Sequence, residues 1–192
     1  MSWKLTMIAI CVLGLWLAAV NDQRAQGGVW LDVPFVKQER NLCGAACISM
    51  VLQYWSGFAK HQVATPLPSS NEIGQTLYSK EAAAIQGKEI ERYFGEHGYQ
   101  AFVFKGEWAD LEQHLSKGRP LIACVEAGGK GAPLHYVVIV GIDPQQALVL
   151  VNDPAQRKLL KLSRSNFEKS WEPTTRWTLL ALPRLTSSQS LD

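Results

Sequence analysis

The stretch from Gln38 to Trp55 reads QERNLCGAACISMVLQYW, and it constrains the fold more than any other part of the chain. Its apolar residues recur at the i, i+3, i+4, i+7 spacing of one helix face, at Ile48, Val51, Leu52 and Trp55. Gly57 is a typical residue to end such a helix. Asn41 is a good N-cap, because its side-chain oxygen can accept a hydrogen bond from a free backbone N–H. We therefore predict a core helix with Cys43 near its second position.

Cys43 would lie at the positive end of this helix. The helix macrodipole and the free N–H groups there favour a negative charge, so they lower the pKa of a thiol and populate the reactive thiolate. A free cysteine is also one of the most frequently buried residue types and packs as a small hydrophobe. Position alone therefore leaves two alternatives for Cys43, a nucleophile and a packing residue.

Most helical patterns in the remaining chain come before most strand patterns. Helices are predicted from the cap Asn71 to Tyr78, over 85–94, over 107–117, and after the cap Ser163. In the 107–117 helix, Trp108, Leu111 and Leu115 are predicted to face inward. Strands or extended segments are predicted over 29–36, 101–106, 120–128, 135–143, 147–154, 158–163 and 176–182. The 135–143 segment is apolar on both faces, which predicts a strand in the middle of a sheet. This order favours an α+β fold with helices packed on a mostly antiparallel sheet.

The first residues are typical of an export segment. Lys4 precedes an uncharged apolar run over 7–20, and a polar stretch follows. The run is shorter than the roughly 20 residues of a membrane span, and small residues end it, which predicts an export signal cut after Ala19. Leu17 fits that cut poorly, so an uncleaved membrane anchor is the alternative. We expect residues 1–26 to be this segment, 27–185 a single domain and 186–192 a frayed tail.

Composition narrows the class of protein. The chain has 192 residues, 47% of them hydrophobic, which is enough for one domain with a packed core. Its net charge is only +2, and the lysines and arginines are scattered, so the sequence lacks the basic stripe that nucleic acid requires. Without the export segment three cysteines remain, Cys43, Cys47 and Cys124. An odd number in an exported protein fits one disulfide, with Cys47 and Cys124 as the favoured pair, and one free thiol. The alternative is that Cys47 packs in the core as a free thiol.

A cysteine nucleophile needs a base, and the base needs a group that orients it. Of the four histidines, His61, His97 and His114 lie among polar neighbours and are predicted at the surface. His135 begins the apolar strand after a glycine-rich loop. A tight turn joins this strand to the next, so antiparallel pairing would bring the end of the second strand, Asn152-Asp153, beside His135. The carboxylate of Asp153 could then accept the imidazole N–H and orient the ring.

Gln38 completes the set, five positions before Cys43. Acyl transfer needs hydrogen-bond donors for the oxyanion that develops, and a side-chain amide with the backbone N–H of Cys43 would provide two. Alone, Gln38 would be a solvated loop residue. The combination of the four parts is what favours a catalytic role.

Three segments together, VPFVKQERNLCGAAC, HYVVIVGID and VNDP, resemble the bacteriocin-processing, double-glycine leader peptidases and their stand-alone relatives. The resemblance covers residues 33–154 and implies a papain-like cysteine peptidase. It implies Cys43 as nucleophile, His135 as general base and then acid, Asp153 as its orienting group and Gln38 in the oxyanion hole. It further implies a peptide or protein substrate and no cofactor.

The chain differs from the transporter-borne members of that family, because it carries an export signal and no GxxxxGK[ST] phosphate loop. We therefore expect a stand-alone, exported enzyme that is periplasmic or extracellular and binds no ATP. An amidase or acyl transferase would use the same groups. Two further alternatives are a metal site made by Cys43, Cys47, Cys124 and His135, and a non-catalytic, membrane-tethered binding module.

Overall fold

The computed structural model describes residues 27–58, 66–126, 128 and 131–184. The predicted export segment over 1–26, His61 and the predicted tail over 186–192 lie outside the described residues, so these predictions stay untested. Within the described ranges, none of the helices has the length and apolar character needed to cross a membrane. The elements are β1 (Val29–Trp30), α2 (Cys43–Ser56), α3 (Ser70–Leu77), α4 (Gly87–Glu96), β2 (Tyr99–Lys105), α5 (Trp108–Ser116), β3 (Leu121–Glu126), β4 (Leu134–Asp143), β5 (Leu148–Asn152), β6 (Leu160–Ser163), α6 (Arg164–Trp171), the short 3-10 helix η1 (Glu172–Thr174) and β7 (Trp177–Pro183).

The strands form one seven-stranded sheet. Six of them lie in the order β2-β7-β3-β4-β5-β6, and β1 pairs with the C-terminal end of β4. The described pairings are all antiparallel. Strand β4 lies in the interior of the sheet and is buried at eight of its ten positions, as its apolar sequence predicts. The prediction of an α+β fold with a mostly antiparallel sheet is therefore confirmed.

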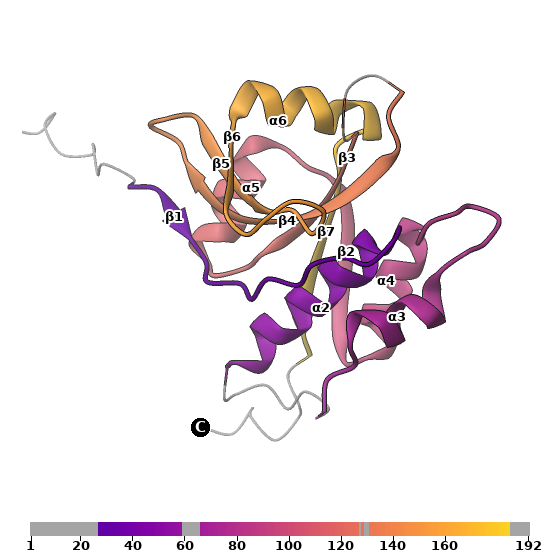
Figure 1. Cartoon of the computed structure of the whole chain (residues 1–192). Coiled ribbons are helices and arrows are strands. Elements are labelled where there is room, and N and C mark those ends of the chain that lie inside the picture. The colour runs from indigo at the N-terminus through magenta and orange to yellow at the C-terminus, as the bar shows by residue number, and fades with distance from the viewer. Residues whose placement is uncertain (1–26, 59–65, 127, 129–130, 185–192) are drawn as a thin grey trace, which may run out of the picture.

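Helices cover both faces of this sheet. Figure 1 shows α6 above the sheet and the group α2, α3 and α4 below it. One apolar cluster joins α2, α3 and α4 to the face that carries Tyr136 and Val138. A second cluster joins α5 and α6 to the face that carries Val137 and Ile139. Because neighbouring strand residues point to opposite faces, the start of β4 contributes to both layers.

Helix α2 confirms the predicted inward face, since Ile48, Val51, Leu52 and Trp55 are all buried. The predicted cap is wrong. Leu42 is the N-cap residue and offers no side-chain hydrogen bond, while Asn41 has a left-handed φ of 56°. Asparagine tolerates this conformation better than most residues, so Asn41 makes the tight turn before the helix and does not cap it. Cys43 consequently becomes the first helical residue.

Helix α3 begins with a different cap from the predicted one. The Ser69 hydroxyl accepts from the N–H of Glu72, and the Glu72 carboxylate accepts from the N–H of Ser69, which is a capping box. Asn71 lies inside the helix, and its side-chain amide donates to Glu39 at 2.8 Å. The prediction of Asn71 as the cap is therefore wrong, because the Ser-x-x-Glu pattern satisfies two backbone groups together.

The other predicted helices are confirmed within a few residues. In α5 the predicted inward residues Trp108, Leu111 and Leu115 are buried. In α6 the predicted cap Ser163 accepts from the N–H of Asn166 at 3.3 Å. Gly98, which follows α4, has a φ of +85° that glycine adopts without strain.

Of the two alternatives for Cys47, the disulfide is wrong and packing in the core is confirmed. Cys47 and Cys124 are both free thiols, and both are buried in the cluster between α2 and the sheet. There they pack as small hydrophobic side chains, which is the role that free cysteine commonly has in a core.

Candidate active site

The start of α2 lies beside the start of β4, an interior strand of the sheet. Cys43 is partly exposed there as the first residue of α2, and His135 is the second residue of β4. Both line a cleft of about 820 Å³, together with Gln38. The structure thus brings His135 to Gln38 and Cys43, about 90 positions earlier in the sequence, as predicted.

Asp153 supplies the partner of His135. The ring nitrogen Nε2 of His135 lies 2.7 Å from Oδ1 of Asp153, and the two side chains are only 10% and 6% exposed. An ionised carboxylate can only accept hydrogen bonds, so Nε2 is the donor. That leaves Nδ1 of the ring for Cys43. The predicted pairing of β4 with β5 is confirmed, with Val138 opposite Asn152.

Asn152, the other residue predicted to lie beside His135, has a different role. It is fully buried, and its side-chain amide donates to the carbonyl of Val33 at 3.1 Å. Its side-chain oxygen accepts from the N–H of Leu159 at 3.0 Å. Asn152 therefore connects β5 to the extended segment before α2, whereas Asp153 faces the histidine.

The environment of Cys43 favours a thiolate. Burial by itself raises the pKa of this thiol, but a hydrogen bond with His135 and another from the backbone N–H of Tyr136 outweigh burial, so the net pKa is lowered. Burial alone would lower the pKa of His135, yet its hydrogen bonds with Asp153 and Cys43 raise it to about 9. A thiolate beside an imidazolium is the pair that these two shifts favour.

Asp153 is held in its ionised form. Burial raises the pKa of this carboxyl, but the hydrogen bond with His135 and bonds from Ala155 and Gln156 outweigh it, so the pKa is lowered. Oδ1 accepts from the N–H of Ala155 at 2.9 Å, and Oδ2 accepts from the side-chain amide of Gln156 at 2.6 Å. Each oxygen of this carboxylate thus has at least one donor.

Gln38 reaches the cleft on an extended segment that the Asn152-Asp153-Pro154 turn holds in place. Its backbone N–H donates to the carbonyl of Pro154 at 2.9 Å. Its side-chain oxygen is buried and has no hydrogen-bond partner among the described residues. The side-chain NH2 of Gln38 is one hydrogen-bond donor at this cleft. The first N–H groups of a helix have no partner inside the helix, so the backbone N–H of Cys43 is a second one.

The walls of the cleft are uncharged. One wall is the segment 82–87, and the other is formed by Pro133, Leu134 and Tyr136. None of the described residues that line it is Asp, Glu, Lys or Arg. Leu134, next to the buried His135, is 61% exposed.

The remaining cysteines and histidines do not join this site. Burial raises the pKa of Cys124 to about 12 and that of Cys47 well above its ordinary value, so both stay protonated. His97 is exposed and stacks on Tyr93, as a surface prediction requires. His114 is half-buried with Nδ1 enclosed, so its surface prediction is only partly correct.

The alternative of a metal site finds no support. In the part of the chain that the structure describes, no three histidine, cysteine, aspartate or glutamate side chains are arranged to hold a metal ion.

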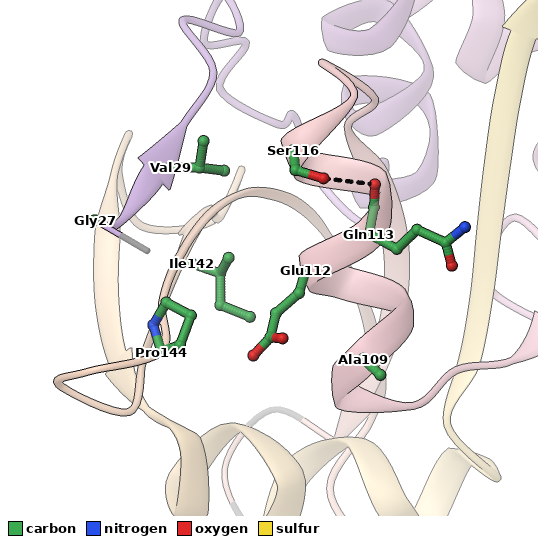
Figure 2. A pocket seen from close by; sticks show the side chains of 8 residues that line it. All are labelled: Gly27, Val29, Ala109, Glu112, Gln113, Ser116, Ile142 and Pro144. Atoms are coloured by element: carbon green, nitrogen blue, oxygen red, sulfur yellow. Dashed lines mark hydrogen bonds between the residues drawn. The ribbon is translucent and has the colours of Figure 1, made fainter. Parts of the chain in front are cut away.

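A second cavity, of about 460 Å³, lies between β1, α5 and the end of β4 (Figure 2). Its lining contains one ionisable group, the carboxylate of Glu112, which faces Ile142 and Pro144 in Figure 2. The cavity shares no lining residue with the cleft at Cys43. Its polar lining residues, Glu112, Gln113 and Ser116, all come from α5.

Two of the residues that hold the site together were missed at the sequence level, Asn152 as a structural clamp and Gln156 as a donor to Asp153. Glutamine is common in solvated turns, so residue type gave no signal for Gln156. A signal was nevertheless present. The tetrapeptide pattern Asp-Pro-x-Gln occurs twice, at 143–146 and at 153–156.

Comparison with known proteins gives a consistent result. The family model described as "Peptidase_C39 like family" matches residues 30–178. No curated protein matches the chain. Among solved structures, the peptidase domain of Streptococcus ComA, a bi-functional ABC transporter involved in quorum sensing, has a TM-score of 0.62 at 18% identity. That match covers 78% of this chain and 98% of the other.

Two further structures have the same fold. A putative C39-like peptidase from Bacillus anthracis has a TM-score of 0.61 at 16% identity, and the match covers 84% of this chain and 100% of that one. A double glycine motif protease from an AMS/PCAT transporter, solved in complex with the leader peptide, has a TM-score of 0.59 at 21% identity. Here the match covers 83% of this chain and 96% of the other. At these identities the likeness establishes the fold, and the predicted papain-like fold is confirmed.

Proposed function

The chain belongs to the Peptidase_C39-like family, and from that premise we propose that it is a cysteine peptidase that cuts a peptide bond through the Cys43 thiolate. The observation that carries the proposal is the continuous chain of contacts from Cys43 to His135 to Asp153 at the cleft. A nucleophile, its base and the group that orients the base are thereby present in the order that acyl transfer requires.

In the first half-reaction the Cys43 thiolate attacks the carbonyl carbon of the substrate, and a C–S bond forms. The negative charge moves to the carbonyl oxygen, where the N–H of Cys43 and the side-chain amide of Gln38 stabilise it. When the tetrahedral intermediate collapses, the C–N bond breaks. His135 gives its proton to the leaving amine, and a thioester to Cys43 remains.

In the second half-reaction His135 is neutral and can take a proton from water. The resulting hydroxide attacks the thioester carbon, the C–S bond breaks, and the carboxylic acid product leaves. Cys43 leaves as the thiolate while His135 keeps the proton that it took from water, which restores the starting thiolate–imidazolium pair, so one water is consumed for each bond cut. Asp153 stays ionised throughout and holds the ring so that Nδ1 faces Cys43.

We propose a peptide segment as the substrate. The family membership supports it, and so does the uncharged cleft beside Cys43, which fits a chain with small or apolar side chains. The structurally similar AMS/PCAT protease was solved with a leader peptide. An amidase or acyl transferase would use the same groups, so product analysis has to accompany any assay of this chain.

The test compares Cys43→Ala with a matched control, Cys47→Ala, one helical turn away on α2. The purified proteins are incubated with a proteome-derived peptide library, and mass spectrometry reads the new chain ends. We expect cleavage by the unaltered protein and by Cys47→Ala, and a loss of about 10⁴-fold or more with Cys43→Ala. Cleavage that survives in Cys43→Ala would contradict the proposal, and amide or acyl-transfer products without cut peptides would favour the alternatives.

A further inference from the structure

The carboxylate of Asp153 depends on a residue outside the proposed catalytic set. Its Oδ1 is shared by His135 and the N–H of Ala155, at 2.7 and 2.9 Å. Its Oδ2 accepts a hydrogen bond from the side-chain amide of Gln156 at 2.6 Å. Both oxygens of the carboxylate thus accept hydrogen bonds, and Gln156 is the only described side chain that donates to Oδ2.

Gln156 is placed by the turn and not by its side chain. Its backbone N–H donates to the carbonyl of Asp153 at 3.0 Å, and the N–H of Asp153 donates to the carbonyl of Arg157 at 3.1 Å. These backbone bonds do not involve the Gln156 side chain, which is free to fold back over the carboxylate. A substitution at Gln156 therefore removes the donor while leaving the turn intact.

A hollow of about 230 Å³ lies behind the His135–Asp153 pair, and Gln156 is part of its lining. Without the Gln156 amide, Oδ2 would face this hollow. The torsion that turns a carboxylate about its last bond is broad and roughly two-fold, so the carboxylate could rotate toward water there. Such a rotation would take Oδ1 away from Nε2 of His135.

We propose that Gln156 is a positioning residue, whose side-chain amide fixes the Asp153 carboxylate in the rotation that presents Oδ1 to His135. The inference rests on the proposed function, because it concerns the same pair of side chains. The amide is neutral, so it stabilises the ionised carboxylate without adding a charge that would compete with the imidazolium. A weaker hold on His135 then weakens the thiolate at Cys43.

The pH dependence follows from the ionisable groups that surround Asp153. His135 from β4 and Cys43 from α2 form the reactive pair, Cys47 lies one turn further along α2, and Glu126 from β3 lines the same hollow. Of these, only the imidazolium favours a charged Asp153, and it is stabilised in return. If Asp153 turns away, His135 loses its proton at lower pH and the Cys43 thiolate forms at higher pH. The pH range in which the thiolate and the imidazolium coexist therefore narrows at both ends.

The experiment measures the rate at which iodoacetamide alkylates Cys43 between pH 5 and pH 9, with the labelled peptide identified by mass spectrometry. It needs no substrate, because the thiolate is the reacting species. The variants are Gln156→Met, which keeps the length and removes the donor, and Gln146→Met, which makes the same change in the exposed turn after β4. We expect the midpoint for Gln156→Met to rise by about half a pH unit, a roughly threefold change in thiolate fraction, and Gln146→Met to match the unaltered protein.

Gln156→Glu provides a second readout that a purely structural role would not produce. An ionised Glu repels Asp153, whereas a protonated Glu is again a donor to Oδ2. The alkylation rate of this variant relative to the unaltered protein should therefore increase as the pH falls toward 5.

Steady-state kinetics gives a third readout. With a cleaved peptide from the library as substrate, kcat of Gln156→Met should fall about tenfold while KM stays within twofold.

The outcomes separate the two proposals. If Cys43 of the unaltered protein titrates like an ordinary thiol, the proposed function fails. If it titrates low, and Gln156→Met and Gln156→Glu have the same pH profiles as the unaltered protein, the proposed function stands and the role of Gln156 is overturned. Equal shifts in Gln156→Met and Gln146→Met would also overturn it, because they would reflect a general effect of turn stability.

Discussion

Two turns of nearly the same sequence follow β4 and β5. The first is Asp143-Pro144-Gln145-Gln146 and the second is Asp153-Pro154-Ala155-Gln156. In both, the glutamine side chain donates to Oδ2 of the aspartate, at 2.7 Å in the first turn and 2.6 Å in the second. In both, Oδ1 accepts from a backbone N–H inside the turn, that of Gln146 in the first and that of Ala155 in the second.

The two turns differ in what else reaches the aspartate. The hydrogen bonds that the described residues give to the side chain of Asp143 both come from Gln146, at the solvent-facing end of β4. Asp153 is only 4% exposed, and its Oδ1 also accepts a hydrogen bond from Nε2 of His135. The local pattern therefore accounts for the bond between amide and carboxylate in both places. Only at Asp153, among these two turns, does the sheet also bring a histidine to the carboxylate.

The largest expected difference between the turns is in activity. Asp153→Ala should lower kcat/KM by about 100-fold, about 2.7 kcal/mol of transition-state stabilisation, because His135 loses the group that holds its ring. Asp143→Ala should stay within about twofold of the unaltered enzyme, since its carboxylate contacts only its own turn. Steady-state kinetics with one cleaved peptide measures both. Similar losses in the two variants would show that turn stability, and not orientation of His135, is what matters.

The residue before each aspartate gives the next largest effect. Asn152 is fully buried and bonds the carbonyl of Val33 and the N–H of Leu159. Asn152→Ala leaves both groups without a partner, so it should lower the free energy of unfolding by about 2 kcal/mol. It should also lower kcat by about tenfold, because the segment that carries Gln38 loses a fixed point.

Ile142 holds the matching position in the first turn and is buried among apolar residues. Ile142→Val should cost about 1 kcal/mol of stability and leave kcat unchanged. Urea unfolding and kinetics on the two variants separate the effects. A loss of kcat in Ile142→Val as large as in Asn152→Ala would mean that any weakening of the sheet disturbs the site.

Much of the architecture could be predicted from hydrophobic periodicity. The inward faces of α2 and α5 could be predicted, because a 3.6-residue period of apolar residues specifies which side of a helix is buried. The pairing of β4 with β5 could be predicted from the short connection between them, and that pairing placed Asp153 near His135. The candidate nucleophile and base followed from these elements, since each stands at the first turn of a helix or the beginning of a strand.

Features that depend on neighbouring segments could not be predicted. Asn41 and Asn71 both looked like helix caps by residue type, but the turn before α2 needs a left-handed residue, and Ser69 with Glu72 satisfies more backbone groups at α3. Asp153 was predicted as the group that orients His135, but the role of Asn152 depends on the path of the segment through Val33, which the sequence does not reveal. The free state of Cys47 likewise depends on core packing that a cysteine count does not contain.

The smallest effect is expected from the ion pair that joins the same two segments at the surface. Lys158, just beyond the second turn, lies 2.6 Å from Asp32, but their side chains are 38% and 75% exposed. Water and salt screen such a pair, so Lys158→Ala should change the free energy of unfolding by about 0.5 kcal/mol or less, and less still in 1 M salt. Urea unfolding at low and high salt measures this. A loss of unfolding free energy as large as that of Asn152→Ala would mean that the surface ion pair, and not the buried amide of Asn152, holds the segment of Gln38 against the turn at 153–156.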